Sequence, residues 1–323
     1  MMKPILITED VHFIGAFDSA IRTFDIIMKT ANGSSYNSYL VRGSDGVAVI
    51  DTAKLEFASD FFTRLEAVAS YNEIKYIILN HLEPDHSGCL PELIKRSPGA
   101  KVIISSRAQG MLKALLKSNI SYEVAKEDLS LGNKTLRFYN TPFLHWPDTM
   151  CTFLVEDQIL FSGDIFGSHF CDQRVFDDKV GDFQYAFKYY YDHIMRPFKS
   201  YALKALNLLK DVPIKTICPS HGPVLRTNPS LYMDMYRTWS QEKKSSPGGG
   251  GDKKVIVFYI TSYGNTGLMA EKMFEGLESV PGIRPAMFDL ASLETENMIN
   301  LLEESDGILV GTPTINGDAV KPA

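Results

Sequence analysis

The chain is poor in cysteine, and none of its cysteines lie close together in sequence. Only four of the 323 residues are cysteine, and no CxxC pair occurs. This absence excludes a zinc ribbon and a disulfide framework. We therefore expect four reduced, buried thiols, at Cys89, Cys151, Cys171 and Cys218.

Long apolar runs and basic blocks are also missing. The N-terminal stretch MMKPILITEDVHFIGAFD contains early acidic residues, and no later run reaches the ~20 apolar residues that a membrane span needs. The net charge of −6, without any cluster of Lys and Arg, argues against nucleic acid as a partner. We expect a cytoplasmic protein that binds neither membrane nor nucleic acid.

A low-complexity stretch divides the chain. Residues 240–252 are rich in Lys and Ser and contain four consecutive glycines, a composition that forms a flexible linker and not a core. We expect one domain over residues 1–239 and another over residues 253–323. Two domains also agree with the usual ~100–200 residues per domain.

The first domain alternates short apolar runs with helical patterns. Runs at 23–30, 38–43 and 46–53 predict strands, and the polar residues 31–37 between the first two predict a turn. Further elements are predicted as a helix at 55–69, a strand at 74–80, a helix at 89–98, a strand at 100–105 and a helix at 106–119. Mixed strands and helices predict a layered α/β fold.

The second domain begins with an apolar strand, a polar turn and an amphipathic helix over residues 253–278. Two more apolar runs, at 283–290 and 305–313, predict strands. This order is typical of a doubly wound βαβαβ arrangement.

Candidate metal ligands follow several predicted strands. The stretch NHLEPDHSG places His81, Glu83, Asp85 and His86 within six positions, directly after the strand at 74–80. Three more candidates each follow an apolar run: His145, Asp164 and His221. A single histidine after a strand is usually a hydrogen-bonded loop residue. Several such strand ends, one of them carrying four candidates, instead indicate a metal centre on a rigid platform.

These motifs resemble the metallo-β-lactamase fold and, within it, the flavodiiron proteins (A-type flavoproteins). The hydrolases of this superfamily usually read HxHxDH, whereas this chain has Glu83 at the position of the second histidine. Zinc commonly binds at histidine-rich sites, whereas mixed sets of histidine and carboxylate ligands are typical of non-haem iron. The substitution therefore favours redox chemistry over hydrolysis.

The resemblance implies a fold, a ligand set and an activity. The fold would be an αβ/βα sandwich followed by a partial flavodoxin-like domain. One iron would be held by His81, Glu83 and His145, the other by Asp85, His86 and His221, with Asp164 bridging. The protein would reduce dioxygen to water, nitric oxide to nitrous oxide, or both. Electrons would pass through FMN from a separate rubredoxin-like donor, within a head-to-tail homodimer.

Two loops of the second domain resemble flavodoxin loops that bind FMN. ITSYGNTG offers donors at a helix N-terminus, where a phosphate binds, and lacks the Gly-Lys-Ser/Thr of a nucleotide P-loop. GTPTINGD resembles the loop beside the flavin ring. The candidate residues are Thr261, Ser262, Tyr263, Gly264, Asn265, Thr266, Pro313, Thr314, Asn316 and Gly317.

The second domain departs from the family pattern, because a flavodoxin has five strands and residues 253–323 supply three. We expect a fragment of a longer chain, or a truncated gene product, in which FMN binding is weakened and the strand at 305–313 is an unpaired edge. The diiron domain should fold regardless.

Two alternatives remain open from the sequence. One is a dinuclear zinc hydrolase of the same fold, and the other is a non-enzymatic diiron sensor of O2 or NO. Around the ligands, we expect Trp146 and Pro147 to line the pocket, and His169 to support the site more readily than to bind metal.

Overall fold

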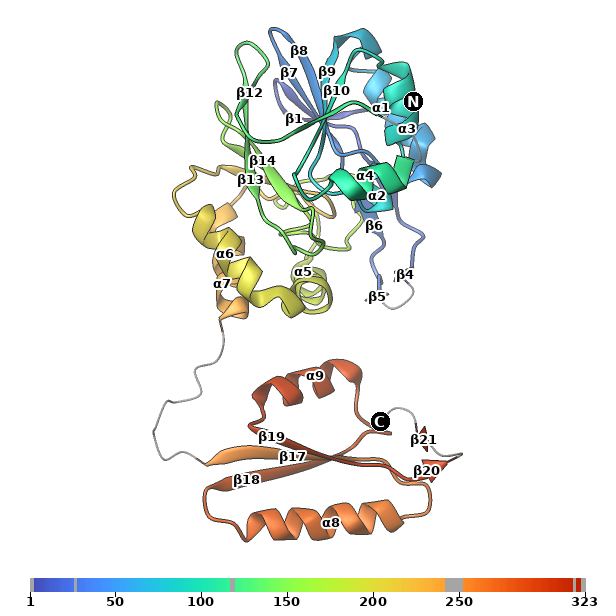
Figure 1. Cartoon of the computed structure of the whole chain (residues 1–323), viewed down its shortest axis with the longest axis vertical. Coiled ribbons are helices and arrows are strands. Elements are labelled where there is room, and N and C mark those ends of the chain that lie inside the picture. Colours follow the sequence, from blue (N-terminus) through green and yellow to red (C-terminus); the bar gives the residue numbers. More distant parts are fainter. Residues whose placement is uncertain (1–2, 26–27, 117–119, 242–251, 316–317, 321–323) are drawn as a thin grey trace. The chain divides into compact units, whose positions relative to one another are not determined.

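The computed structural model describes residues 3–25, 28–116, 120–241, 252–315 and 318–320. The chain divides into two compact units, Met1–Gln241 and Glu242–Ala323 (Figure 1). Most of the predicted linker, residues 242–251, lies outside the described residues.

Two sheets form the centre of the first unit. The larger has the order β1-β2-β7-β8-β9-β10-β11 and the smaller the order β12-β13-β14-β15-β16. The strands of the larger sheet are β1 (Ile5–Thr8), β2 (Val11–Phe13), β7 (Tyr39–Gly43), β8 (Gly46–Ile50), β9 (Ile74–Leu79), β10 (Lys101–Ile104) and β11 (Tyr122–Val124). Those of the smaller are β12 (Leu129–Ser130), β13 (Thr135–Asn140), β14 (Met150–Leu154), β15 (Ile159–Gly163) and β16 (Thr216–Pro219).

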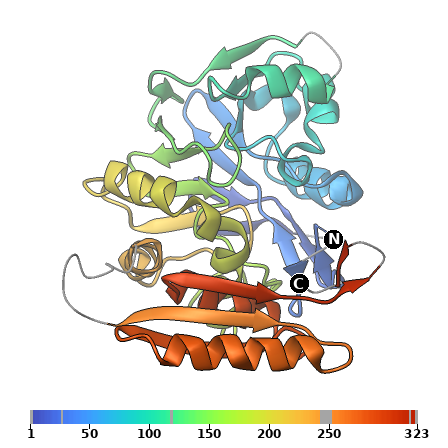
Figure 2. The same cartoon turned by 60° about the horizontal axis from the view of Figure 1, so that its bottom comes forward.

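The two sheets pack face to face, and helices cover their outer faces. One buried cluster joins the inner faces, with Val41 and Ile78 from the larger sheet and Leu154 and Phe161 from the smaller. A second cluster joins the outer faces to the helices (Figures 1 and 2). The helices are α1 (Ala58–Glu66), α3 (Leu90–Arg96) and α4 (Gln109–Leu116) on the larger sheet, and α5 (Gln184–Tyr190), α6 (Lys199–Leu208) and α7 (Pro229–Ser240) on the smaller. The predicted αβ/βα sandwich is confirmed.

Strand β9 shows why the sequence adopts this arrangement. Its residues IKYIIL are almost entirely apolar, and β8 and β10 pair with it in parallel. Parallel strands in the middle of a sheet are buried on both faces, which requires such a continuous apolar run. The strand ends at Leu79, immediately before the candidate ligands.

The segment before β7 differs from its prediction. Residues 31–37 were predicted as a turn, but β6 (Ser34–Tyr36) lies there and pairs antiparallel with β3 (Ala16–Asp18). Its serines are buried because they find hydrogen-bond partners across the fold, which the local sequence does not reveal. The strand predicted at 23–30 is also wrong, because two short strands, β4 (Thr23–Phe24) and β5 (Met28–Lys29), form a hairpin there.

The second unit has a parallel sheet with the order β18-β17-β19. Its main elements are β17 (Lys253–Tyr259), α8 (Asn265–Glu278), β18 (Ile283–Asp289), α9 (Thr295–Glu304) and β19 (Gly307–Gly311), followed by the short strands β20 (Thr314–Ile315) and β21 (Asp318–Ala319). Figure 1 shows α8 and α9 on opposite faces of the sheet. The predicted doubly wound pattern is confirmed.

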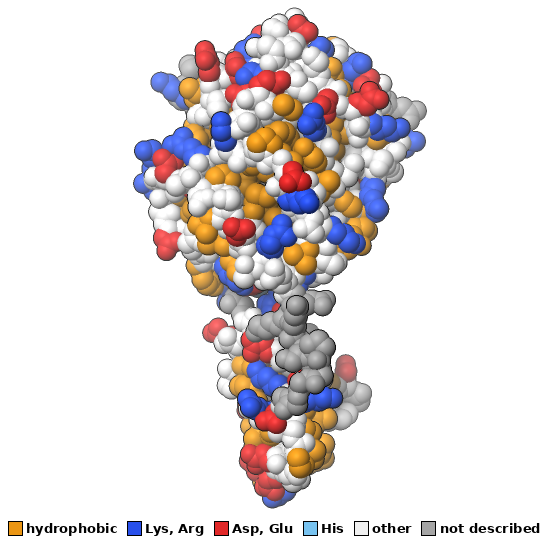
Figure 3. Space-filling view, turned by 90° about the vertical axis from the view of Figure 1, so that its left-hand side faces the viewer, with side chains coloured by type: hydrophobic (Ala, Val, Ile, Leu, Met, Phe, Trp, Pro, Cys, Tyr) orange, Lys and Arg blue, Asp and Glu red, His pale blue; other side chains and the backbone are white. Residues whose placement is uncertain are grey.

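The surface of the first unit and the burial of the cysteines can be compared with the composition. Figure 3 shows one face of the first unit, where hydrophobic side chains lie among charges of both signs. Among the described residues, no helix has the length and apolarity to cross a membrane. All four cysteines are free, and Cys89, Cys151 and Cys218 are buried. Cys171 is only partly buried, so the expectation of four buried thiols was wrong there.

Candidate metal centre

The seven predicted ligands lie in two neighbouring groups. The first group contains His81, Glu83, His145 and Asp164, and the second contains Asp85, His86 and His221. Within each group, one potential ligand atom from every residue lies within 4.8 Å of the others. The structure therefore brings together residues that span 140 positions of sequence, from His81 to His221.

The loop after β9 serves both groups. Glu83 has an extended backbone because Pro84 follows it, and Pro84 begins the short helix α2 (Pro84–Ser87). The extended part carries His81 and Glu83 to the first group. The helical turn then directs Asp85 and His86 to the second group.

Hydrogen bonds hold the other ligand loops against this one. Asn80 accepts a hydrogen bond from Thr152 Oγ1 (2.7 Å) at its side chain and from Met150 N (2.9 Å) at its backbone, beside the loop that carries His145. Gly163 adopts a positive φ of 62°, which lets β15 turn sharply before Asp164. Its carbonyl accepts from Ser220 N (2.8 Å), next to His221.

The first group converges on Glu83 and one oxygen of Asp164. Glu83 Oε2 lies 3.0 Å from Nε2 of His81 and 3.0 Å from Nε2 of His145. Asp164 Oδ2 lies 3.6 Å and 3.4 Å from the same two nitrogens. These four atoms thus face a common point.

The second group converges on Asp85 and the other oxygen of Asp164. Asp164 Oδ1 lies 3.1 Å from His86 Nε2 and 3.6 Å from His221 Nε2. Asp85 lies 3.4 Å from His86 Nε2 and 3.2 Å from His221 Nε2. Asp164 therefore presents one carboxylate oxygen to each group, the arrangement that a bridging ligand requires.

Several of these polar atoms are buried without a hydrogen-bond partner among the described residues. They are both oxygens of Asp85, Oδ1 of Asp164 and both ring nitrogens of His86. Buried polar atoms are normally satisfied, and an unsatisfied one costs about 1–3 kcal/mol. Convergent, unsatisfied donors and acceptors of these types fit metal ions held by the two groups.

The electrostatics of the groups point the same way. Burial alone lowers the pKa of His81, His86 and His145, but the surrounding carboxylates outweigh burial and raise each pKa to about 10. Burial raises the pKa of Asp164, but the histidines around it, led by His86, hold the pKa well below its usual range. The carboxylates are thus arranged to stabilise positive charge at this place, whether it is carried by protons or by metal ions.

Trp146 lies beside the ligands, whereas Pro147, which was also expected to line the pocket, is exposed. The rings of Trp146 and His81 are nearly perpendicular, with centroids 5.0 Å apart, in keeping with a pocket wall. His169 belongs to neither ligand group. Its Nδ1 contacts Ser34 Oγ (2.9 Å), and its ring lies 4.3 Å from that of Phe24.

Two buried carboxylates beside the candidate ligands were not predicted from the sequence. Asp148 contacts His81 Nδ1 at 3.2 Å and accepts from Leu82 N at 2.8 Å. Asp51 accepts from Asn80 N at 2.8 Å and is fully buried, which raises its pKa to about 7. Asp51 directly follows β8, so the strand-end signal that identified Asp164 could have found it. Asp148 follows no strand and carries no such signal.

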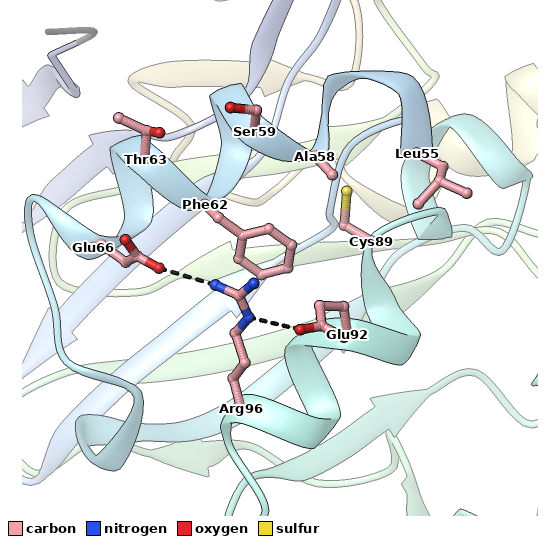
Figure 4. A pocket seen from close by; sticks show the side chains of 9 residues that line it. All are labelled: Leu55, Ala58, Ser59, Phe62, Thr63, Glu66, Cys89, Glu92 and Arg96. Atoms are coloured by element: carbon pink, nitrogen blue, oxygen red, sulfur yellow. Dashed lines mark hydrogen bonds and ion pairs between the residues drawn. The ribbon is translucent and has the colours of Figure 1, made fainter.

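A separate hollow of about 470 Å³ lies between α1 and α3 and contains none of the candidate ligands (Figure 4). Arg96 lies over the Phe62 ring and pairs with Glu66 (3.0 Å) and Glu92 (2.9 Å). Its charges are thus satisfied internally. The metal chemistry belongs to the ligand groups and not to this hollow.

The predicted phosphate loop lies at the end of β17 and the beginning of α8. Gly264 precedes α8 with a positive φ of 84°, and Thr261 Oγ1 is buried without a partner among the described residues. Ser262, Tyr263, Gly264 and Asn265 are exposed, Tyr263 by 94%. An open turn at a helix N-terminus with an unsatisfied hydroxyl fits a phosphate.

The second predicted flavin loop lies beside the first. Strands β17 and β19 are parallel neighbours, so the loops after them meet at one edge of the sheet. The order of the strands reverses at this pair, which is where ligands bind in doubly wound folds. Pro313 and Thr314 lie in this second loop, whereas the candidates Asn316 and Gly317 lie outside the described residues.

Comparisons with known proteins agree with this architecture. Residues 35–222 match the family model of the ODP family beta lactamase, and residues 257–323 match that of flavodoxin. The chain is 49% identical to the type A flavoprotein fprA of Rhodobacter capsulatus, over 98% of this chain and 74% of that protein. It is 34% identical to the anaerobic nitric oxide reductase flavorubredoxin of Salmonella arizonae, over 97% and 66% respectively. Among solved structures, the rubredoxin oxygen:oxidoreductase of Desulfovibrio gigas superposes with a TM-score of 0.79 at 27% identity, covering 98% of this chain and 79% of that one.

Proposed function

The chain belongs to the type A flavoproteins, the flavodiiron family of oxidoreductases, and we propose that it reduces dioxygen to water, nitric oxide to nitrous oxide, or both. Relatives bear names for each activity, one an anaerobic nitric oxide reductase and another an oxygen:oxidoreductase. The cofactors of this proposal are two iron ions and FMN.

The observation that carries the proposal is the position of Asp164 between the two groups. Its two oxygens face different ligand groups, with Oδ2 near His145 Nε2 (3.4 Å) and Oδ1 near His86 Nε2 (3.1 Å). A single carboxylate in this position supports a dinuclear centre and not two independent ions. We assign Asp164 as the bridging ligand.

Each iron position receives equal donors from the chain. His81, His145 and Glu83 would hold the first iron, and His86, His221 and Asp85 the second, each position adding one oxygen of Asp164. Bound iron supplies reversible one-electron redox chemistry and open coordination positions for a small gas.

Glu83 tunes the centre toward electron release. A histidine at its position would be neutral, whereas the pKa of Glu83 is lowered, against the effect of burial, by hydrogen bonds from His145 and His81. The carboxylate therefore adds a negative charge at the first position. Ferric ions carry more positive charge than ferrous ions, so this charge stabilises the oxidised state. Such a centre is suited to reducing a gas and poorly suited to polarising an ester.

The second unit is assigned to electron delivery. FMN supplies one-electron and two-electron carrier chemistry. We assign its phosphate to the turn formed by Thr261, Ser262, Asn265 and Thr266, and its ring to the loop that contains Pro313 and Thr314. A separate rubredoxin-like donor and a head-to-tail homodimer follow from the family resemblance and remain proposals, as does a location in the cytoplasm.

The test begins with metal content per chain, measured by elemental analysis of protein purified without added metal. We expect about two irons and little zinc, because both groups mix imidazole with carboxylate. Consumption of O2 and NO by the iron-loaded chain, supplied with reduced flavin, would then identify the preferred gas. A zinc-filled centre that excludes iron supplied under anaerobic growth would instead support a hydrolase. Iron that binds either gas without turnover would support a sensor.

A further inference from the structure

The histidines of the two groups differ in what lies behind them. Nδ1 of His81 faces the carboxylate of Asp148, with distances of 3.2 Å and 3.4 Å to its two oxygens. Nδ1 of His221 instead faces the backbone carbonyl of Ser35 at 2.7 Å. Nδ1 of His86 is buried and has no hydrogen-bond partner in the described part of the chain. A carboxylate partner is thus seen at the first group only, as far as the described hydrogen bonds go.

Asp148 is held in place independently of His81. Its side chain is only 1% exposed, and its Oδ2 accepts a hydrogen bond from Leu82 N (2.8 Å). Since the backbone donor next to His81 fixes one oxygen, the other remains directed at the imidazole. The pair is therefore built into the fold and does not depend on a mobile side chain.

A buried carboxylate behind a metal-binding histidine strengthens the metal bond. The carboxylate accepts a hydrogen bond from Nδ1–H, which fixes the tautomer that has a free lone pair on Nε2. The negative charge also makes Nε2 a stronger electron-pair donor to the metal. Loss of such a partner typically lowers metal affinity about 10–100-fold. A neutral carbonyl behind His221 fixes the tautomer but supplies no negative charge.

The donors themselves do not distinguish the two positions. Each would use two imidazoles, one carboxylate of its own and one oxygen of Asp164. Any difference in affinity must therefore come from residues outside the ligand set. On this basis we propose that Asp148 makes the first position the tighter of the two, so that the chain gives up the metal held by Asp85, His86 and His221 first. The inference rests on the proposed ligand set.

Solvent exposure should make the first position exchange its metal faster, but it does not set the affinity for the metal. The side chains of His145 and Glu83 in the first group are 20% and 12% exposed, more than any ligand of the second group. Access to solvent changes how fast a metal exchanges, whereas Asp148 changes how strongly the metal is bound. The test must therefore be made at equilibrium.

The experiment is a competition for ferrous iron in the full chain, kept anaerobic and equilibrated with increasing concentrations of a ferrous chelator. We expect two steps of one iron each, at least about tenfold apart in chelator concentration. His221→Ala should abolish the weaker step and leave the tighter one, which assigns the steps to the two groups.

Asp148→Asn tests the residue itself. The amide is uncharged and replaces one carboxylate oxygen with an NH2 group, so the negative charge behind His81 is lost, and the tighter step should shift by about 10–100-fold toward the weaker one. Asp177→Asn is the control, because Asp177 is a carboxylate that accepts from the backbone N atoms of Arg226 (3.2 Å) and Thr227 (3.2 Å), away from both ligand groups. It should leave both steps in place.

The midpoint potential of the bound iron distinguishes an electrostatic role of Asp148 from a general loss of structure. The iron retained in His221→Ala should have a more positive midpoint potential when Asp148→Asn is added, because a charge that stabilises the ferric state is removed. A single release step in the wild-type chain would overturn the inference, as would an Asp148→Asn chain that behaves like Asp177→Asn. Such a chain could still hold two irons and reduce a gas. Absence of iron would instead defeat the proposed function.

Discussion

The two ligand groups contain the same donors but lie in different surroundings. Both combine two histidines with a carboxylate and share Asp164. The first group is partly open at His145 and Glu83, and a buried carboxylate stands behind His81. The second group is more buried. Nδ1 of His221 faces a backbone carbonyl, and Nδ1 of His86 has no hydrogen-bond partner among the described residues. The first group is thus more open and has a carboxylate partner, whereas the second group is more enclosed.

This difference comes from parts of the fold that lie far from the ligand motif in sequence. The loop that carries His81 to His86 supplies both groups, so it cannot by itself make them unequal. Asp148 acts from the loop between β13 and β14. The enclosure comes from aromatic rings around His221: that of Phe24 in β4 lies 5.6 Å away, that of Tyr36 in β6 5.9 Å and that of Tyr190 in α5 6.0 Å. The Phe24 ring also lies 4.3 Å from that of His169.

Loss of Asp164 should abolish metal binding at both groups. Asp164→Ala deletes the oxygen that each group uses, and it leaves buried histidines of both groups without their central carboxylate. We expect the metal content to fall from about two ions per chain to nearly none. Elemental analysis after equilibrium dialysis against iron measures this directly.

Asp164→Asn is a milder variant that tests the same bridging role. Asp164→Asn keeps the size of the side chain but offers one oxygen ligand, so we expect about one metal ion to remain. Asp177→Asn serves as the control for loss of a carboxylate outside the ligand groups. Retention of two ions by Asp164→Ala would show that the groups bind independently, and the bridging assignment would fail.

Glu83 should determine which metal the first group prefers. Glu83→His recreates the HxHxDH pattern and replaces an anionic oxygen with a neutral nitrogen, the donor that suits zinc. After loading with equal iron and zinc, we expect the zinc-to-iron ratio at the first position to rise roughly tenfold. Glu83→Gln is the control, because it removes the charge without adding an imidazole. Equal ratios in Glu83→His and the wild type would remove Glu83 from the account of metal choice.

The candidate ligands could be proposed from sequence because most of them follow buried strands. His81 comes after β9, Asp164 after β15 and His221 after β16, and apolar runs of this kind are visible without a structure. His145 is different, since it lies five residues beyond the end of β13. Its position depends on Thr149, whose Oγ1 accepts from Leu144 N (3.2 Å).

The supporting residues could not be identified in this way. Asp148 is one acidic loop residue among several, and its partner His81 lies 67 positions away. Ser34 looks like a turn residue, yet it is buried in β6 because His169 Nδ1 lies 2.9 Å from its hydroxyl. Such contacts are decided by tertiary packing, which overrides local propensity. A single sequence therefore reveals donors more readily than the environment that makes them unequal.

Phe24 should control how fast the second group exchanges its metal, with a smaller effect than the ligand variants. Phe24→Ala removes a ring that is 8% exposed and packs against His169 and His221. We expect iron to leave the second position several-fold faster in a stopped-flow chelation experiment, because water and chelator reach His221 more easily. The first position should keep its rate, since Phe24 makes no ring contact with His81 or His145 among the described residues.

Phe17→Ala is the matched control for this variant. Phe17 lies in β3 of the same segment, but its ring stacks on Phe13 at 5.2 Å, away from the ligands. Both variants lose a phenyl ring and should lower the free energy of unfolding, by at most about 3–5 kcal/mol. If Phe17→Ala accelerates iron loss as much as Phe24→Ala does, general loosening explains the effect. If only Phe24→Ala does so, and only at the second position, the enclosure of that group is local and separable from the strength of the first.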